Sequence, residues 1–152
     1  MNQLKWTCQT FEELSKEDLY HILMERVNVF VVEQKCPYPE IDQRDQQALH
    51  LMAKENDTIV AYCRIFPSGV VYEEASIGRV LVTQAGRKKG YGKLLLNAAL
   101  DKLNERNETS VKIQAQAYLK SFYESFGFEV VSDCYDEDGI PHIDMVKKKR
   151  AY

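Results

Sequence analysis

The chain has 152 residues, of which 45% are hydrophobic and 28% charged, with 7 glycines and 4 prolines. A chain of this length can bury an adequate core, and the composition excludes collagen-like, low-complexity and intrinsically disordered proteins. The net charge of -3 argues against a general nucleic-acid binder, which carries a basic excess for phosphate contacts. We therefore expect a single domain over residues 1–152 and no nucleic-acid partner.

The predicted elements begin with a strand at residues 4–8 and a helix that follows it. Ser15 is a typical N-cap residue, and apolar residues recur behind it at helical spacing as far as Phe30. The helix is predicted to end near Glu33, because the prolines shortly after it fix φ and cannot continue a helix. The next stretch, residues 37–47, is polar and irregular.

Three strands are predicted in the middle of the chain. Residues 50–54 and 59–66 flank a turn-prone stretch at 55–57, as the two strands of a hairpin do. A third strand is predicted at residues 75–82, where the apolar residues indicate a position in the core of a sheet.

The second half of the chain alternates helices and strands. A helix is predicted over residues 91–106 from apolar residues that recur along one helical face. A half-buried strand at 111–115, a short helix at about 118–126 and a terminal pair of strands at 128–132 and 142–147 follow. Because no repeat or linker interrupts this order, the sequence predicts one α/β domain.

The cysteines and the apolar segments allow predictions about metal binding and about the cellular compartment. The 4 cysteines form no Cys-x-x-Cys pair and no Cys/His cluster with zinc spacing, so no metal site is expected. The first residues lack the apolar run of a signal peptide, and every apolar run is too short to cross a bilayer. We therefore expect a cytoplasmic protein with no membrane partner.

The most informative segment joins the strand at 75–82 to the helix at 91–106. It contains Arg87, Gly90 and Gly92 among several lysines. The glycines let backbone N–H groups approach a ligand, and the start of a helix favours an anion. Basic side chains at this end oppose the helix dipole unless an anion binds there. The segment therefore predicts a site for a phosphate-bearing ligand.

Specific residues exclude two common nucleotide-binding loops. A P-loop aligned on Gly92 and Lys93 places Arg87 where its first glycine belongs and Leu94 where a magnesium-binding hydroxyl belongs. A dinucleotide-binding fingerprint needs a third glycine at the position of Leu95. The phosphate ligand must therefore be of another kind.

The pattern Arg87-x-x-Gly90-x-Gly92 resembles the coenzyme A pyrophosphate loop of the GNAT N-acetyltransferase superfamily. A second segment, residues 115–128, resembles a later strand and helix of that family, with its Phe-Tyr-x-x-x-Gly-Phe signature. Residues 29–38 resemble the ElaA-like branch in particular, so the likeness extends over nearly the whole chain.

The resemblance implies acetyl-CoA as co-substrate and the GNAT version of an α/β (α+β) fold. That fold has a mixed, mostly antiparallel sheet, splayed by a bulge at the cofactor site and flanked by about four helices. The splayed strand is expected to pair with the pantetheine amides, and the N–H of Leu81 or Val82 to polarise the thioester carbonyl. The expected cofactor-binding residues are Val80, Leu81, Val82, Arg87, Lys88, Lys89, Gly90, Tyr91, Gly92 and Lys93.

Three residues are candidates for the proton transfers. Tyr123 matches the tyrosine that many family members use as general acid toward the coenzyme A thiolate, and a phenol stays protonated at neutral pH. Simple packing is the alternative for Tyr123. Glu33 and His50 are the candidate bases, acting directly or through water, and partial burial would raise the pKa of Glu33 into a useful range. Their alternatives are a solvated helix end for Glu33 and a hydrogen-bonded strand residue for His50.

The acceptor is expected to be a small-molecule or peptide amine. Glu33, Glu40, Asp42 and Asp45 are expected to line the acceptor mouth and to attract a cationic amine, with a plain solvated loop as the alternative. His142 is expected to reach the acceptor side from the last strand or else to face solvent. Edge strands of the sheet offer a route to a homodimer.

The sequence thus predicts an N-acetyltransferase that works by direct attack within a ternary complex, without an acyl-cysteine intermediate. One alternative is an acyl-homoserine-lactone synthase, because Arg26-x-x-x-Phe30 and Asp42-x-x-Asp45 resemble the N-terminal motifs of those enzymes. Those enzymes are longer, however, and lack the Arg-x-x-Gly-x-Gly loop. The other alternative is a coenzyme A-binding or interaction module without turnover, which the intact loop argues against.

Overall fold

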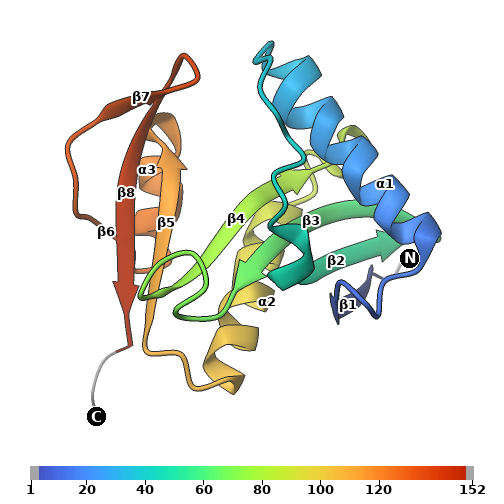
Figure 1. The fold of residues 1–152 in the computed structure, drawn as a ribbon, viewed down its shortest axis with the longest axis horizontal. Coiled ribbons are helices and arrows are strands. Elements are labelled where there is room, and N and C mark those ends of the chain that lie inside the picture. Colours follow the sequence, from blue (N-terminus) through green and yellow to red (C-terminus); the bar gives the residue numbers. More distant parts are fainter. Residues whose placement is uncertain (1–3, 150–152) are drawn as a thin grey trace.

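The structure is a computed structural model that describes residues 4–149 (Figure 1). The chain forms one sheet from β1 (Leu4–Thr10), β2 (Leu49–Glu55), β3 (Thr58–Phe66), β4 (Ala75–Val82), β5 (Ser110–Gln116), β6 (Glu129–Val130), β7 (Tyr135–Glu137) and β8 (Ile140–Lys148). The strand order is β1-β2-β3-β4-β5-β8-β6, and β7 pairs with β8. All neighbours are antiparallel except β4 and β5. The predicted mixed, mostly antiparallel sheet is therefore confirmed.

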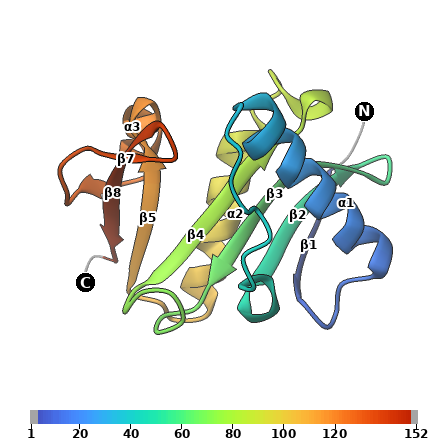
Figure 2. The ribbon, with the colours of Figure 1, turned by 45° about the horizontal axis from the view of Figure 1, so that its top comes forward.

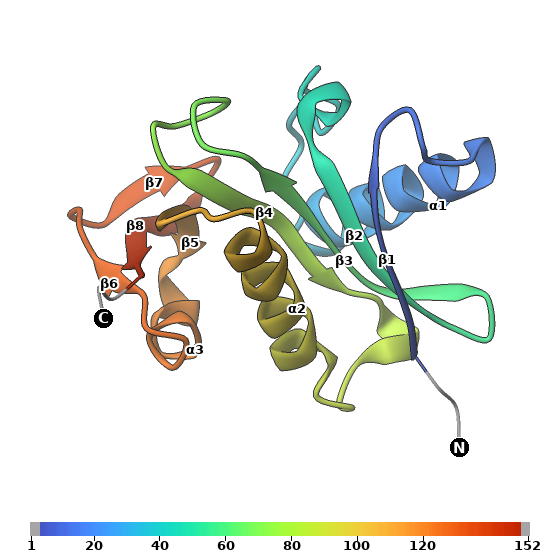
Figure 3. The ribbon, with the colours of Figure 1, turned by 90° about the horizontal axis from the view of Figure 1, so that it is seen from below.

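Helices cover both faces of the sheet. In the described range the α-helices are α1 (Lys16–Arg26), α2 (Tyr91–Glu105) and α3 (Lys120–Glu124). Figure 3 shows α1 on one face of the sheet and α2 on the other. The Ser15 side chain caps α1 by accepting a hydrogen bond from the Asp18 amide at 3.1 Å, as the sequence predicted. The helical path continues to Glu33 as expected, but Val27–Glu33 is π-helical.

Each face of the sheet has its own apolar core. Leu96, Ala99 and Leu103 of α2 are buried against the larger cluster, as their spacing predicted. On the opposite face, Ile22 of α1 packs in a smaller cluster that includes Tyr62 of β3. Full burial of an aliphatic side chain contributes about 1.5–3 kcal/mol. The two cores hold β3 and β4 rigidly between α1 and α2.

The last third of the chain differs in detail from the prediction. The expected helix at about 118–126 begins as a 3₁₀ turn, Ala117–Leu119, and its α-helical part ends at Glu124. Gly127 follows with φ 94°, a conformation that ends helices and favours glycine. The strand expected at 128–132 is reduced to Glu129–Val130, because that segment pairs only briefly with β8.

The sheet opens between β4 and β5 (Figure 2). Their parallel pairing is limited to Ala75 with Val111 and Ser76 with Lys112, beyond which the strands diverge. On the other edge of β4, two residues lie opposite one residue of β3 between Tyr62 and Arg64, which is a β-bulge. The splayed sheet expected from the resemblance is therefore present.

Candidate active site

A cavity of about 640 Å³ lies where β4 and β5 diverge. Its walls come from the π-helical segment Val27–Glu33, the irregular stretch 36–44, β4, β5 with α3, and the turn between β7 and β8. Of the ten residues predicted to bind the cofactor, Val80, Leu81, Val82 and Arg87 line this cleft. The fold thus brings distant segments together around an open strand edge, a common position for a ligand site.

The backbone of β4 exposes polar groups along that edge. The Thr83 amide donates to the Val60 carbonyl at 3.0 Å and so faces β3. Because successive peptide groups in a strand alternate direction, the Val82 amide and carbonyl face the opposite edge, toward the cleft. The Arg87 Nε–H reaches the Val82 carbonyl at 3.2 Å from the cleft side. Of the two amides expected to polarise a thioester, Val82 has the required direction.

The loop before α2 leaves backbone donors at the start of the helix. Gly90 is the N-cap with φ 76° and supplies no side-chain cap, and Lys88 also has positive φ, 65°. The first amides of a helix have no intrahelical acceptor, so those of Tyr91, Gly92 and Lys93 are available to an anion. The adjacent strand edge and helix start can therefore hold the two polar parts of an extended phosphate ligand.

Two of the predicted cofactor residues point elsewhere. Lys89 Nζ lies 3.2 Å from a Glu55 carboxylate oxygen, and the Tyr91 hydroxyl donates to the same carboxylate. Glu55 ends β2, so these contacts tie the loop to the β2–β3 turn. Lys89 and Tyr91 position the loop in this structure and lie outside the cleft lining.

Arg87 and Glu33 form a bidentate ion pair across the mouth of the cleft. Arg87 Nη1 and Nη2 donate to the Glu33 carboxylate at 2.7 and 2.6 Å. The Glu33 side chain is 39% exposed, and its hydrogen bonds with Arg87 lower its pKa. The expectation that burial raises the pKa of Glu33 is therefore wrong. The apolar run precedes Glu33, but the carboxylate itself lies at the surface beside the Arg87 guanidinium.

Tyr123 of α3 lines the cleft and is 7% exposed. Phe122 and Phe128 contact its ring edge-on, at centroid distances of 5.2 and 6.0 Å. Its hydroxyl forms no hydrogen bond with any described residue, and burial raises its pKa to about 12. A phenol in this setting stays protonated at neutral pH and has a proton to donate.

His50 is not in the cleft. Its ring is fully buried in β2, with Nδ1 2.7 Å from the Tyr62 hydroxyl and Nε2 2.9 Å from the Asp45 carbonyl. Burial lowers the pKa of His50. Both ring nitrogens are engaged and His50 is outside the cleft lining, so it is a hydrogen-bonded strand residue, which was the alternative. His50 is therefore not placed to act as the base.

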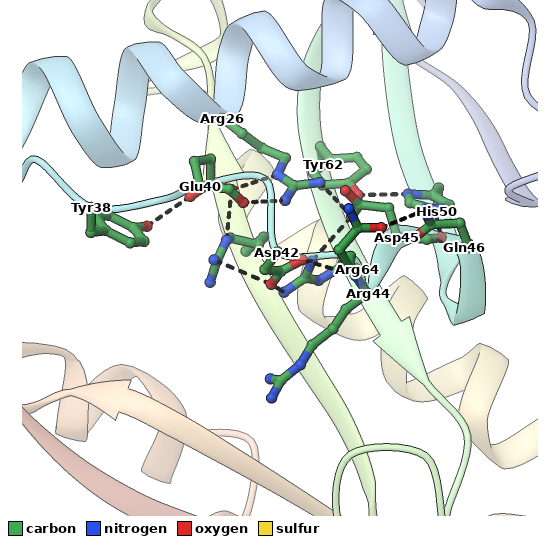
Figure 4. Close-up of polar contacts among 12 residues, drawn as sticks. Arg26, Tyr38, Glu40, Asp42, Arg44, Asp45, Gln46, His50, Tyr62 and Arg64 are labelled. Atoms are coloured by element: carbon green, nitrogen blue, oxygen red, sulfur yellow. Dashed lines mark hydrogen bonds and ion pairs between the residues drawn. The ribbon is translucent and has the colours of Figure 1, made fainter.

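The acidic residues of the irregular stretch belong to a buried ion network (Figure 4). Glu40 Oε2 accepts from Arg26 and Arg79, each at 2.7 Å. Asp45 Oδ1 accepts from Arg26 at 2.6 Å and from Arg64 at 3.0 Å. The network joins α1, β3 and β4 through the segment between α1 and β2.

Asp42 is the acidic member of this network that lines the cleft, together with Arg64 and Arg79. Both of its carboxylate oxygens accept from Arg64, at 2.9 and 2.8 Å. Burial opposes its charge, but these hydrogen bonds outweigh burial and lower its pKa to about 2. Glu40 and Asp45 are only 4% and 5% exposed and lie outside the cleft lining, so the prediction is wrong for these two acids, while Glu33 and Asp42 do line the cleft. The sequence showed the acids but not the three arginines that neutralise them.

His142 lies in the cleft wall, as expected for the last strand. Its Nδ1 is 2.7 Å from the Ile140 carbonyl, and its ring stacks on Tyr135 at 6.2 Å. These contacts fix the position of the His142 ring in the cleft wall.

Sequence reasoning missed the arginines and one glycine. Arg64 and Arg79 stand within apolar strand segments, and a charged residue there needs a buried partner, which was a usable signal. Arg79 has φ 50° at the bulge, which no sequence pattern indicated. Gly86 is required because a Cβ there would lie 2.8 Å from the Val60 carbonyl oxygen.

Among residues 4–149, no group of three or more His, Cys, Asp or Glu side chains is arranged to hold a metal ion. None of the helices in that range is long and apolar enough to span a membrane.

Comparison with known proteins agrees with this geometry. A sequence model of the acetyltransferase (GNAT) domain matches residues 11–149. ElaA of Escherichia coli is 41% identical over 148 residues, covering 95% of this chain and 97% of ElaA. The crystal structure of that ElaA covers 96% of this chain and all of its own, with a TM-score of 0.89. An acyl-CoA N-acyltransferase from Pseudomonas aeruginosa is 39% identical, covers 95% of this chain and 99% of its own, and has a TM-score of 0.91.

A GNAT fold with an open β4 edge and a coenzyme A-type loop defines an acyltransferase, and the chain belongs to the GNAT acetyltransferase family. Within that family it falls in the ElaA-like branch, since the identity with ElaA extends over nearly the whole of both chains.

Proposed function

We propose that the chain transfers an acetyl group from acetyl-CoA to the nitrogen of a primary amine by direct attack. The observation that carries the proposal is the cleft-facing backbone edge of β4 at Val82, which pairs with no strand in residues 4–149, beside the start of α2, which no side chain of that range caps. The strand edge would bind the amides of acetyl-CoA, and the start of the helix would bind its pyrophosphate. The short link from Val82 to Gly90 keeps them together.

The residues of this chain fit such a co-substrate. The Val82 carbonyl can accept from a pantetheine amide in place of the Arg87 Nε–H, which now holds it. The Val82 amide can donate to the thioester carbonyl, and one oxyanion donor of this kind accelerates a reaction by about 10²–10³-fold. Arg87 can exchange Glu33 for a pyrophosphate, which is also a bidentate guanidinium partner.

In the proposed reaction the amine nitrogen forms a bond to the acetyl carbon while the carbon–sulfur bond breaks. Tyr123 supplies a proton to the departing thiolate, because burial of the side chain keeps its hydroxyl protonated and none of residues 4–149 forms a hydrogen bond with it. The amine loses a proton in the same overall reaction. Glu33, once Arg87 has turned to the pyrophosphate, can take that proton directly or through a water molecule.

Thiol release from acetyl-CoA across a panel of primary amines tests the proposal. We expect amine-dependent release that survives alkylation of the 4 cysteines, because the mechanism uses no acyl-cysteine. Loss of release on alkylation, together with full activity of Tyr123→Phe, would overturn the mechanism. Strict dependence on an acyl-carrier protein would favour the acyl-homoserine-lactone-synthase alternative. Binding of coenzyme A without any turnover would favour the non-catalytic module.

A further inference from the structure

We infer that the acceptor amine also carries a carboxylate, which arginine side chains of the cleft bind. The inference rests on the proposed function and concerns the acceptor side of the same cavity. Arg44, Arg64 and Arg79 all line the cavity. Arg64 shares the buried network with Arg26 of α1, so this end of the cavity lies on the face of the sheet that α1 covers.

The carboxylate in the inner part of the cleft is already occupied, because both oxygens of Asp42 are held by Arg64. Glu33 lies at the mouth, where it pairs with Arg87 until Arg87 turns to the pyrophosphate. Glu137 and Asp138 also line the cavity, but they are exposed in the β7–β8 turn at its rim. A purely cationic acceptor such as a polyamine would therefore meet no free carboxylate in the inner part of the cleft.

Arg79 presents unused donors beside the reacting edge. Its Nε–H donates to Glu40 at 2.7 Å, and its Nη2 lies 3.6 Å from Asp42. Its guanidinium lies over the rings of Phe30 and Tyr38, 5.9 and 5.7 Å from their centroids. These contacts fix the group but leave N–H donors on Nη1 without a partner among the described residues.

The backbone at Arg79 supports a functional role for this side chain. Its φ of 50° places a bulky residue in the left-handed region at the bulge. Such a conformation is unfavourable for a side chain of this size, and bulges beside active sites redirect side chains. Arg79 and Val82 both belong to β4 and line the same cavity, so a carboxylate bound by Arg79 would lie in the cleft that contains the proposed thioester edge.

Arg44 supplies a second guanidinium that has no ion-pair or hydrogen-bond partner for its side chain among the described residues. Figure 4 shows its side chain extending away from the Arg26–Asp45–Arg64 network. Guanidinium groups bind carboxylates through paired N–H donors. Arg44 and Arg79 are therefore suited to hold the carboxylate of an acceptor whose amine faces the β4 edge.

The charge of the whole lining fits the same class of acceptor. Arg44, Arg64, Arg79 and Arg87 balance Glu33, Asp42, Glu137 and Asp138. An acceptor with one ammonium and one carboxylate is neutral, as the charged lining is, and the guanidinium donors of Arg44 and Arg79 are available to its carboxylate. An amino acid is the simplest acceptor of this kind.

The test compares L-amino acids with their α-carboxamides as acceptors in the thiol-release assay. The amide keeps the amine and the side chain but replaces the carboxylate. Hydrogen bonds to a charged group predict a preference for the acid of about 10- to 100-fold in kcat/KM. Arg44→Gln should lower the preference for the acid about tenfold by raising the KM of the acceptor. The KM of acetyl-CoA should stay unchanged. Arg44→Lys should restore part of the preference.

Arg106→Gln is the matched control, because Arg106 is exposed at the end of α2 and outside the cleft lining. It should leave the preference unchanged. Equal or better use of the amides, or an unchanged preference in Arg44→Gln, would overturn this inference while the proposed transferase function stands. A panel in which neither acids nor amides are acetylated would overturn both.

Discussion

The Tyr123 hydroxyl is a polar group placed in an apolar wall without a hydrogen bond to any described residue. A hydroxyl without a protein partner contributes little to the stability of the fold. Burial keeps the hydroxyl protonated, and the rings of Phe122 and Phe128 fix the orientation of the Tyr123 ring. Such a group is better explained by a proton-transfer role than by packing.

Replacing Tyr123 by Phe should lower kcat by about 10²-fold, the lower part of the range for general acid catalysis. The acetyl-CoA KM and the melting temperature should change little, because the variant removes a hydroxyl that has no partner. Steady-state kinetics and thermal unfolding measure both quantities. Tyr20→Phe, at an exposed position on α1, is the control and should be fully active. Full kcat in Tyr123→Phe would contradict the role of general acid.

His50 makes the stability of the fold depend on pH. Its pKa in the folded protein lies below the ordinary value of 6.5, chiefly because of burial. The unfolded chain therefore binds a proton more readily, and the free energy of unfolding should fall as the pH drops below about 6.5, by up to about 1.4 kcal/mol per pH unit. Denaturant unfolding at several pH values measures this slope.

His50→Gln should flatten that slope between pH 6.5 and lower values, whatever its effect on absolute stability. His21→Gln, at an exposed position on α1, should keep the wild-type slope. A wild-type slope that His50→Gln leaves unchanged would show that His50 is not the titrating group.

At the scale of the elements, the sequence predicted the strands and helices well where their apolar spacing was regular. The cap at Ser15 and the apolar face of α2 follow from local patterns, whereas the splayed sheet was expected only from the family resemblance. The bulge was expected from the resemblance alone. Its position at Arg79 and the ion network had no local signal, because both depend on contacts between segments far apart in the chain. The Arg87–Glu33 pair was missed for the same reason, since it joins positions 54 residues apart.

The turn between β4 and α2 depends on Gly86, which packs directly beneath β3. A Cβ there would lie 2.8 Å from the Val60 carbonyl oxygen and 3.1 Å from the Tyr91 ring. Gly86→Ala should therefore destabilise the fold by about 1–3 kcal/mol, as overpacking does, and weaken coenzyme A binding by displacing the loop. Thermal unfolding with and without coenzyme A measures both effects.

Gly78→Ala is the matched control for stability, because a Cβ at Gly78 of β4 meets no atom within 4 Å. It should change the free energy of unfolding by less than about 0.5 kcal/mol. Equal melting temperatures for Gly86→Ala and Gly78→Ala would show that the close contact with Val60 is not important.

At the scale of the whole molecule, the ion network connects α1 to the sheet. Arg26 is fully buried and binds both Glu40 and Asp45. Removing one partner of a buried ion pair leaves an uncompensated charge, so Arg26→Met should cost about 3–5 kcal/mol. Arg44→Gln, at an exposed arginine without an ion pair, should change stability by less than about 0.5 kcal/mol. Urea unfolding compares the two variants, and equal stabilities would contradict a structural role for the network.

The net charge of -3 does not show how the charges are distributed over the molecule. Three carboxylates that suggested an acidic acceptor mouth are cancelled by Arg26, Arg64 and Arg79. What remains for ligands is local: free amides and lysines at the start of α2, and guanidinium donors on the acceptor side. The distribution of charge therefore fits the proposed acetyl-CoA and the proposed carboxylate-bearing acceptor, whereas the net charge suggests neither.

The most direct test of the central claim measures both products of one reaction. The protein is incubated with acetyl-CoA and a mixture of primary amines, and mass spectrometry counts N-acetylated amine while a thiol reagent counts free coenzyme A. The account predicts one N-acetylated amine for each thiol released, with both products decreasing together in Tyr123→Phe. Thiol release without any acetylated amine, or acetylation that Tyr123→Phe leaves unchanged, would contradict it.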